Sequence, residues 1–110
     1  MPDQNSIVSG NQYEQVAGNS TVTVAGDQSV QVGRNVVERA VAHRSQTIGK
    51  TLTINAGDEL VIIVGAASLR MKKDGTIVLK GKDITLEGSG KINVKASGDV
   101  VIKGSKVAQN

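Results

Sequence analysis

The sequence predicts an all-β protein built from short strands that repeat every eight residues. Aliphatic side chains recur at this spacing, at Val8, Val16, Val24, Val32, Ala40 and Ile48. A glycine follows the first three of them two residues later, at Gly10, Gly18 and Gly26. Between these positions, apolar side chains alternate with hydroxyls and amides, which is the period of two of a strand with one apolar side. Because one short repeat cannot bury its apolar side alone, the repeats must stack.

The composition predicts a narrow interior. The 110 residues include 13 glycines, no Cys, Trp or Phe, and Tyr13 as the single aromatic residue. A conventional core uses aromatic side chains, because each of them buries a large area. Gly, Val, Ile and Thr also disfavour helices, and the absence of Cys excludes disulfides. We find neither a membrane-length apolar run nor a signal peptide, so any export would use a route other than Sec.

The corners between strands are predicted at the glycines. In residues 21–24 and 29–32 the strict alternation ends two residues before a Gly or its equivalent. We expect Gly to turn the corner with backbone angles that a Cβ would resist. Short polar side chains that can bond the turning backbone come next, at Asn11, Asn19, Asp27 and Asn35.

The repeat register is expected to loosen between Val36 and Val64. Arg34 and Ala42 replace the corner glycine there, and the interval from Ile48 to Ile54 is short. The pattern resumes at spacings of seven or eight, with a turn predicted near Asp74 and Gly75. The resumed pairs are Leu69/Met71, Ile77/Leu79, Ile84/Leu86, Ile92/Val94 and Val100/Ile102. We predict one domain over residues 1–110, frayed at residues 1–6 and 106–110.

Steric considerations favour a homotrimeric, intertwined triple-stranded β-helix. A single chain of such strands would keep open edges and a half-covered apolar side. Each strand supplies about two inward residues, too few for the wide interior of a monomeric solenoid. Three chains wound around one axis pair every strand with strands of the other two chains. The small aliphatic side chains of the repeat, Val8, Val16, Val24, Val32 and Ile48, would then meet at the threefold axis.

The net charge of +3 lies entirely in the second half of the chain. Residues 1–55 carry four basic and four acidic side chains, whereas residues 56–110 carry nine and six. A basic surface attracts nucleic acid or anionic membrane. The lysines alternate with apolar residues rather than clustering, which favours a solvated strand face that resists sideways aggregation. The lack of aromatic residues for base stacking argues against nucleic acid as a partner.

Two groups of residues are candidates for chemistry on the axis. His43 is the only histidine, and three copies around an axis would resemble a metal site, but its corner position predicts that it faces solvent. We therefore predict no metal and no cofactor. Glu14, Glu38 and Gln46 occupy the position that Val22 and Val30 fill in other repeats. They either face the lumen in rings of three that hold water or ions, or a local rotation of the strand turns them outward.

No catalytic constellation is visible. The glycines at 88 and 90 before Lys91 lack the earlier Gly of a phosphate-binding loop, whose place holds Thr85. Asp74 and Asp83 have no nucleophile or histidine beside them in the pattern. We predict that the chain is not an enzyme.

The octads and the segment that follows resemble a known family. Residues 71–107, MKKDGTIVLKGKDITLEGSGKINVKASGDVVIKGSKV, are similar to the C-terminal needle of VgrG, the valine-glycine repeat spike family of bacterial type VI secretion. The resemblance implies a trimeric β-helix related to phage tail spikes. It implies a rod that crowns a contractile, phage-tail-like machine, pierces a target membrane and is secreted through that apparatus. Complete members also carry an N-terminal base that this sequence lacks, so it looks like a needle fragment.

The same resemblance implies a docking surface at the C-terminal end. In the family this end binds a tip protein of the PAAR-repeat type, and effectors ride on either part. An intertwined β-helix ends in unpaired strand groups that another chain can cap. The predicted docking residues are Val100, Ile102, Lys103, Gly104, Lys106 and Val107. The alternatives are a frayed tail that binds nothing, and a basic β-solenoid module that binds anionic membrane or polysaccharide.

Overall fold

The structure, a computed structural model, describes residues 3–110 and contains strands, turns and extended segments. Its three strands are β1 (Glu59–Val64), β2 (Ala67–Lys72) and β3 (Ile77–Lys80), and the described residues form no helix. Residues 3–110 therefore include no helix with the length and hydropathy that a membrane crossing requires. The predicted all-β class is confirmed. The chain divides into two compact units, Met1–Gln46 and Thr47–Asn110, which are described separately.

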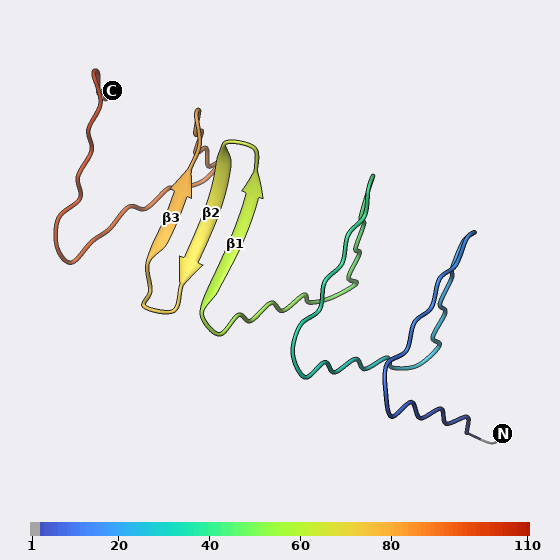
Figure 1. Ribbon diagram of the computed structural model, residues 1–110. Coiled ribbons are helices and arrows are strands. Elements are labelled where there is room, and N and C mark those ends of the chain that lie inside the picture. The colour runs from blue at the N-terminus through green and yellow to red at the C-terminus, as the bar shows by residue number, and fades with distance from the viewer. Residues whose placement is uncertain (1–2) are drawn as a thin grey trace. The chain divides into compact units, whose positions relative to one another are not determined.

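The first unit consists of extended segments that bend at a constant interval. Its bends fall at residues 9–10, 17–18, 25–26, 33–34 and 41–42, which are eight residues apart. The ribbon changes direction repeatedly along this unit, in blue to green in Figure 1. In the second unit the bends at residues 49–50 and 57–58 keep the same interval before β1 begins. The eight-residue period thus extends from residue 9 to residue 58.

This continuity corrects, as far as residue 58, the prediction that the register loosens between Val36 and Val64; from Glu59 to Val64 the octads give way to β1. Arg34 and Ala42 are the second residues of their bends, as Gly10, Gly18 and Gly26 are of theirs. Counting by eight from Ile48 leads to Ala56, and Ile54 falls in the position that Val22 and Val30 occupy. The interval from Ile48 to Ile54 is therefore not a shortened repeat. The repeat appears short in the sequence because the repeat position holds the small Ala56 and the large Ile54 lies two residues earlier.

The predicted backbone angles at the corner glycines are also wrong. Among the described residues only Gly65 and Gly75 have positive φ, at 55° and 95°. Gly10, Gly18 and Gly26 turn their corners without it. This explains why residues with a Cβ, such as Arg34 and Ala42, occupy the same corner position elsewhere.

The strands of the second unit form an antiparallel meander in the order β1-β2-β3. Val64 pairs with Ala67, so Gly65 and Ala66 form a two-residue hairpin loop. The positive φ of Gly65 suits the first central position of a type II′ turn, which matches the twist of the flanking strands. The sequence pattern had placed Leu69/Met71 and Ile77/Leu79 in further stacked repeats. They lie instead in β2 and β3, paired with each other within one chain.

The second hairpin confirms the turn predicted at Asp74 and Gly75. The backbone N–H of Lys72 donates to the carbonyl of Thr76 and that of Gly75 donates to the carbonyl of Lys72, both at 3.0 Å. The Asp74 Oδ1 accepts the backbone N–H of Thr76 at 3.0 Å. These hydrogen bonds hold the pKa of the Asp74 carboxyl below its ordinary value, because they favour its charged form. The Asp58 carbonyl accepts the N–H of Lys73 at 3.0 Å, which extends the pairing past β2.

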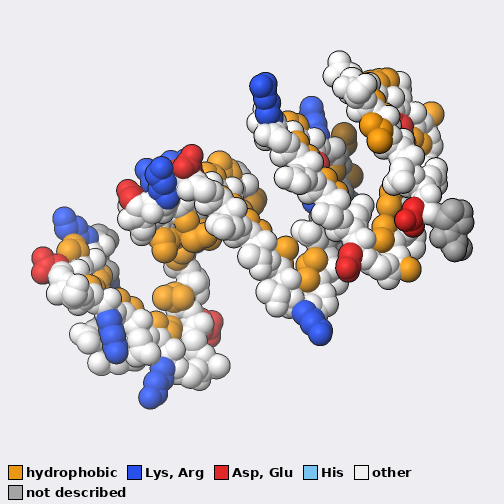
Figure 2. All heavy atoms as spheres, turned by 90° about the horizontal axis from the view of Figure 1, so that it is seen from below, with side chains coloured by type: hydrophobic (Ala, Val, Ile, Leu, Met, Phe, Trp, Pro, Cys, Tyr) orange, Lys and Arg blue, Asp and Glu red, His pale blue; other side chains and the backbone are white. Residues whose placement is uncertain are grey.

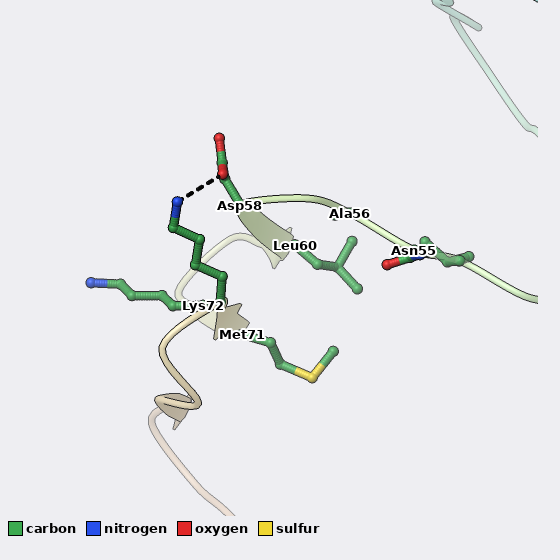
Figure 3. Close-up of a pocket in the computed structure, with 8 residues that line it drawn as sticks. Asn55, Ala56, Asp58, Leu60, Met71 and Lys72 are labelled. Carbon is green, nitrogen blue, oxygen red and sulfur yellow. Dashed lines mark hydrogen bonds and ion pairs between the residues drawn. The ribbon is translucent and has the colours of Figure 1, made fainter.

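The meander has one wholly apolar face and one mixed face. The strand register places eight apolar residues on the first, which we name the apolar face: Leu60, Ile62, Val64, Ala67, Leu69, Met71, Ile77 and Leu79. The opposite, polar face carries Glu59, Val61, Ile63, Ser68, Arg70, Lys72, Val78 and Lys80. In Figure 3 the side chains of Leu60 and Met71 extend to one side of the strands and that of Lys72 to the other. No side chain of the described residues is buried.

We expect Gly65→Ala to destabilise the protein by about 1–2 kcal/mol, because a Cβ disfavours the left-handed conformation by this amount. Gly49→Ala is the matched control. A Cβ at either glycine would have nothing within 4 Å, but Gly49 lacks positive φ and Ala17 and Ala25 already occupy its corner position. The control should change the free energy of unfolding by less than about 1 kcal/mol. Urea unfolding measures both, and equal losses would contradict the hairpin assignment.

We expect the stabilising effect of Asp74 to disappear at low pH. A lowered folded-state pKa means that the carboxylate stabilises the turn above the unfolded-state pKa and loses this effect as pH falls through the folded-state pKa. The difference in urea midpoint between wild type and Asp74→Ala should thus be present at about pH 6 and shrink toward about pH 2. A constant difference for Asp74→Ala across this range would refute the proposed role of the carboxylate.

Candidate functional site

Five repeat positions carry aliphatic side chains that are exposed to nearly the same extent. Val8, Val16, Val24, Val32 and Ile48 are each between 45% and 49% exposed. The aliphatic residues two positions earlier, Val22, Val30 and Ile54, are 63% to 78% exposed. Figure 2 shows hydrophobic side chains open to solvent along the chain. No layer within residues 3–110 covers these five side chains, which we name the repeat face.

The backbone of the repeats is equally uncovered. Outside the β1-β2-β3 ladder, the backbone hydrogen bonds of the described residues all lie between Asp58 and Thr76. Residues 3–57 and 81–110 therefore form no backbone ladder within the chain, although their backbone is extended. Strand edges of this kind are templates for pairing with another chain, because nearly all backbone groups of folded proteins are paired.

The accessible surface area of the chain also shows that a single copy buries little of its surface. The chain of 11.4 kDa exposes 12380 Å². A folded monomer of this mass exposes about 5,800 Å² and its unfolded chain about 16,500 Å². A single copy thus buries far less than a stable monomeric domain needs. The site to be explained is therefore an extended surface for association rather than a cavity for a small molecule.

The charged residues of the repeats include one ion pair. Glu38 accepts a hydrogen bond from Arg44, six residues later, and both side chains are exposed. Ala40 and His43 line the same hollow as this pair. Arg44 is thus a partner that offsets the charge of Glu38, a compensation that a ring of carboxylates would require. The orientation of Glu14, Glu38 and Gln46 relative to an axis stays a prediction.

Metal binding at His43 gains no support from its neighbours in the chain. Within residues 3–110, no group of three or more His, Cys, Asp or Glu side chains is placed to hold a metal ion. His43 shares its hollow with Arg39 and with the ion pair of Glu38 and Arg44, and the absence of a metal on a threefold axis stays a prediction.

The predicted docking residues lie in an exposed, extended segment. Val100, Ile102, Lys103, Gly104, Lys106 and Val107 are all open to solvent, with a bend at Ser105. The segment has no backbone pairing within the chain. It therefore presents unpaired strand groups, as the docking prediction requires, and its partner stays a prediction.

A basic hollow on the polar face of the meander was not singled out from the sequence. Arg70, Lys72 and Lys80 surround it with Ser68 and Val78. The Arg70 Nε lies 3.5 Å from the Glu59 Oε2, which partly neutralises the group. The apolar face was missed as well. The sequence contains a signal for the basic hollow and for the apolar face. Gly65 and Ala66 lie between two strand-like runs, which indicates a two-residue hairpin. A hairpin of this length fixes which residues share a face of the sheet.

The octads, their regular bends and the uncovered repeat face define a β-repeat protein with an eight-residue period. Residues 10–33 match the Gp5 C-terminal repeat family in three copies, which corresponds to eight residues per copy. A stretch of 35 residues is 60% identical to the type VI secretion system spike protein VgrG1b of Pseudomonas aeruginosa PAO1. This stretch covers 32% of the chain and 5% of that relative. The matches confirm the resemblance to the valine-glycine repeat spike family.

Proposed function

We propose that this chain forms a homotrimeric β-helical needle that acts mechanically in the spike of a type VI secretion apparatus. The observation that carries the proposal is the backbone of the repeats, which is extended and regularly bent but unpaired within the chain. Such a backbone becomes stable when other chains supply the missing ladder. The similarity to VgrG1b and to the Gp5 repeat supports the assignment to a spike.

In the proposed trimer, strands of two other copies fill the spaces between successive segments of one chain. The repeat face then turns inward, where side chains as small as valine fit around a threefold axis. The chain's single aromatic, Tyr13, is 85% exposed, which is consistent with an interior too narrow for a ring. Gly10, Gly18 and Gly26 have open space around them in one chain. The same corner position holds Arg34 and Ala42 in other repeats, so this space also accommodates side chains in the proposed trimer.

The needle's role follows from its stiffness. Continuous ladders between three chains must all break together for the rod to bend or unwind, which gives high kinetic stability. We propose that the rod is delivered by the apparatus, pierces a target membrane and carries effectors. Its C-terminal residues 100–107 dock a tip protein of the PAAR-repeat type. The proposal gives this chain no catalytic role and no cofactor.

A basic module that binds anionic membrane or polysaccharide is the alternative. The hollow formed by Arg70, Lys72 and Lys80 favours it. This alternative leaves the unpaired backbone of residues 3–57 unexplained, and the trimeric needle accounts for it. We therefore place the needle first.

We expect the protein to sediment as a trimer that resists SDS without heating. Val24→Asp on the repeat face should destabilise the trimer, because three carboxylates would meet in an apolar interior. Thr23→Asp, its neighbour on the other side of the strand, should leave the trimer nearly unchanged. Sedimentation equilibrium and unheated SDS gels measure both variants. A wild-type protein that sediments as a monomer at micromolar concentration would overturn the proposal.

We expect truncation after Lys95 to abolish binding of a PAAR-repeat tip protein, since it removes the docking residues, while the trimer largely remains. Truncation after Val107 is the control and should bind normally, because it keeps all six docking residues. Calorimetry or co-sedimentation with the tip protein measures binding. Undiminished binding by the shorter chain would exclude docking at residues 100–107 without affecting the trimer.

A further inference from the structure

The meander differs from the rest of the chain in the source of its hydrogen bonds. β1, β2 and β3 pair with each other, so this sheet satisfies much of its backbone without a second copy. Residues 3–57 and 81–110 have no such ladder. Three strands with a hydrophobic face approach the minimum for independent stability once that face is covered. The meander is therefore the part of the chain best able to take shape before other chains arrive.

Its apolar face is fully formed and uncovered. All eight side chains on it are apolar, and Leu69 lies at its centre, paired with Ile62 on one side and Leu79 on the other. Ile62, Val64, Ile77 and Leu79 are each more than half exposed. A hollow lined by Ile62, Leu69 and Leu79, among others, opens on this face. Monomeric soluble proteins rarely leave an apolar surface of this kind exposed. We therefore expect a partner to cover these side chains.

We propose that the apolar face of the meander is the surface through which copies of this chain first associate, and that this contact sets the register in which the repeats then wind together. This inference rests on the proposed trimer and deepens it. The occupant is the same face of two further copies. Once the meanders are in contact, the unpaired segments on both sides are held close together. Their ladders then form between chains at a much lower entropic cost.

The phase of the sequence supports a second copy as the occupant. The repeat face uses even-numbered residues, and Leu52, Ile54 and Ala56 continue this phase up to the bend at residues 57–58. Leu60, Ile62 and Val64 of the apolar face are even-numbered too. Within the second unit, the same phase of the sequence is therefore apolar before and after the bend at residues 57–58, which favours the same kind of partner, a second copy, on both sides of it.

The charges on the polar face exclude it as the contact between copies. It carries Arg70, Lys72 and Lys80 against the single carboxylate of Glu59. Two such faces would repel each other, and their unpaired cations would lose hydration on burial. The apolar face carries no charged side chain that would lose hydration on burial. The two faces of one sheet therefore differ in what they can contact, and each strand offers adjacent residues that test this difference.

Leu79→Glu and Val78→Glu form a matched pair on β3, because both replace an exposed aliphatic residue and only Leu79 is on the apolar face. We expect Leu79→Glu to weaken trimer association on the order of 100-fold or more, since it places three carboxylates in the contact. Val78→Glu should change it by less than about threefold, because it lies beside Arg70. Sedimentation equilibrium of the full chain gives both values.

Cysteine cross-linking tests proximity rather than stability. The sequence contains no cysteine, so single Leu79→Cys and Val78→Cys variants report on one position each. A short bis-maleimide should link two copies of Leu79→Cys within each trimer and should link few copies of Val78→Cys. Refolding kinetics tests the order of events. Leu79→Ala should slow the association of chains, whereas Val24→Ala should mainly accelerate dissociation, because the repeats pair later.

The outcomes separate this inference from the proposed needle. A monomeric wild type overturns the trimer and this contact with it. A trimeric wild type in which Leu79→Glu and Val78→Glu associate equally well overturns the contact alone. So does equal cross-linking at the two positions. If Val24→Ala slows association as much as Leu79→Ala, the first contact is not at the meander. The inference is supported if weaker trimer association, cross-linking between copies and slower association of chains are each found at Leu79 and not at the control positions.

Discussion

The hydrogen-bonding groups of an extended backbone are the constraint on which the rest of this structure depends. The octads hold their backbone straight for about six residues, bend it and repeat, and in doing so they make no ladder within the chain. Backbone N–H and C=O groups are obligatory hydrogen-bonding groups, so a stable state has to supply partners for them. The small repeat residues, the even exposure of the repeat face and the large accessible surface are all consistent with partners from outside the chain.

The meander satisfies the same constraint in the opposite way. Gly65 and Gly75 adopt the positive φ that tight turns need, and the chain folds back on itself at both. The corner glycines of the octads do not, so the chain there bends without reversing into its own previous strand. Two kinds of glycine position thus separate two kinds of β structure within 110 residues. The meander completes its backbone pairing within the chain, whereas the octads leave their backbone unpaired.

Charged side chains are placed differently in the two kinds of β structure. On the meander, the register gathers the basic side chains and Glu59 on the polar face and leaves the apolar face uncharged. Among the octads, Glu38 stands at a position that valine fills in other repeats, and Arg44 pairs with it. A solitary carboxylate at such a position would carry a desolvation cost on assembly that an ion pair reduces.

The sequence alone determined the all-β class, the eight-residue period, the repeat positions and the turn at Asp74 and Gly75, because these depend on spacing and on local turn chemistry. Only the tertiary structure decided that the period continues unbroken to residue 58, since Arg34, Ala42 and Ala56 hide it by residue type. The pairing of β2 with β3 was likewise beyond the pattern, because alternation shows that a strand has two sides and does not say which strand lies beside it. The apolar face followed from that register, which the two-residue loop of Gly65 and Ala66 fixes between β1 and β2.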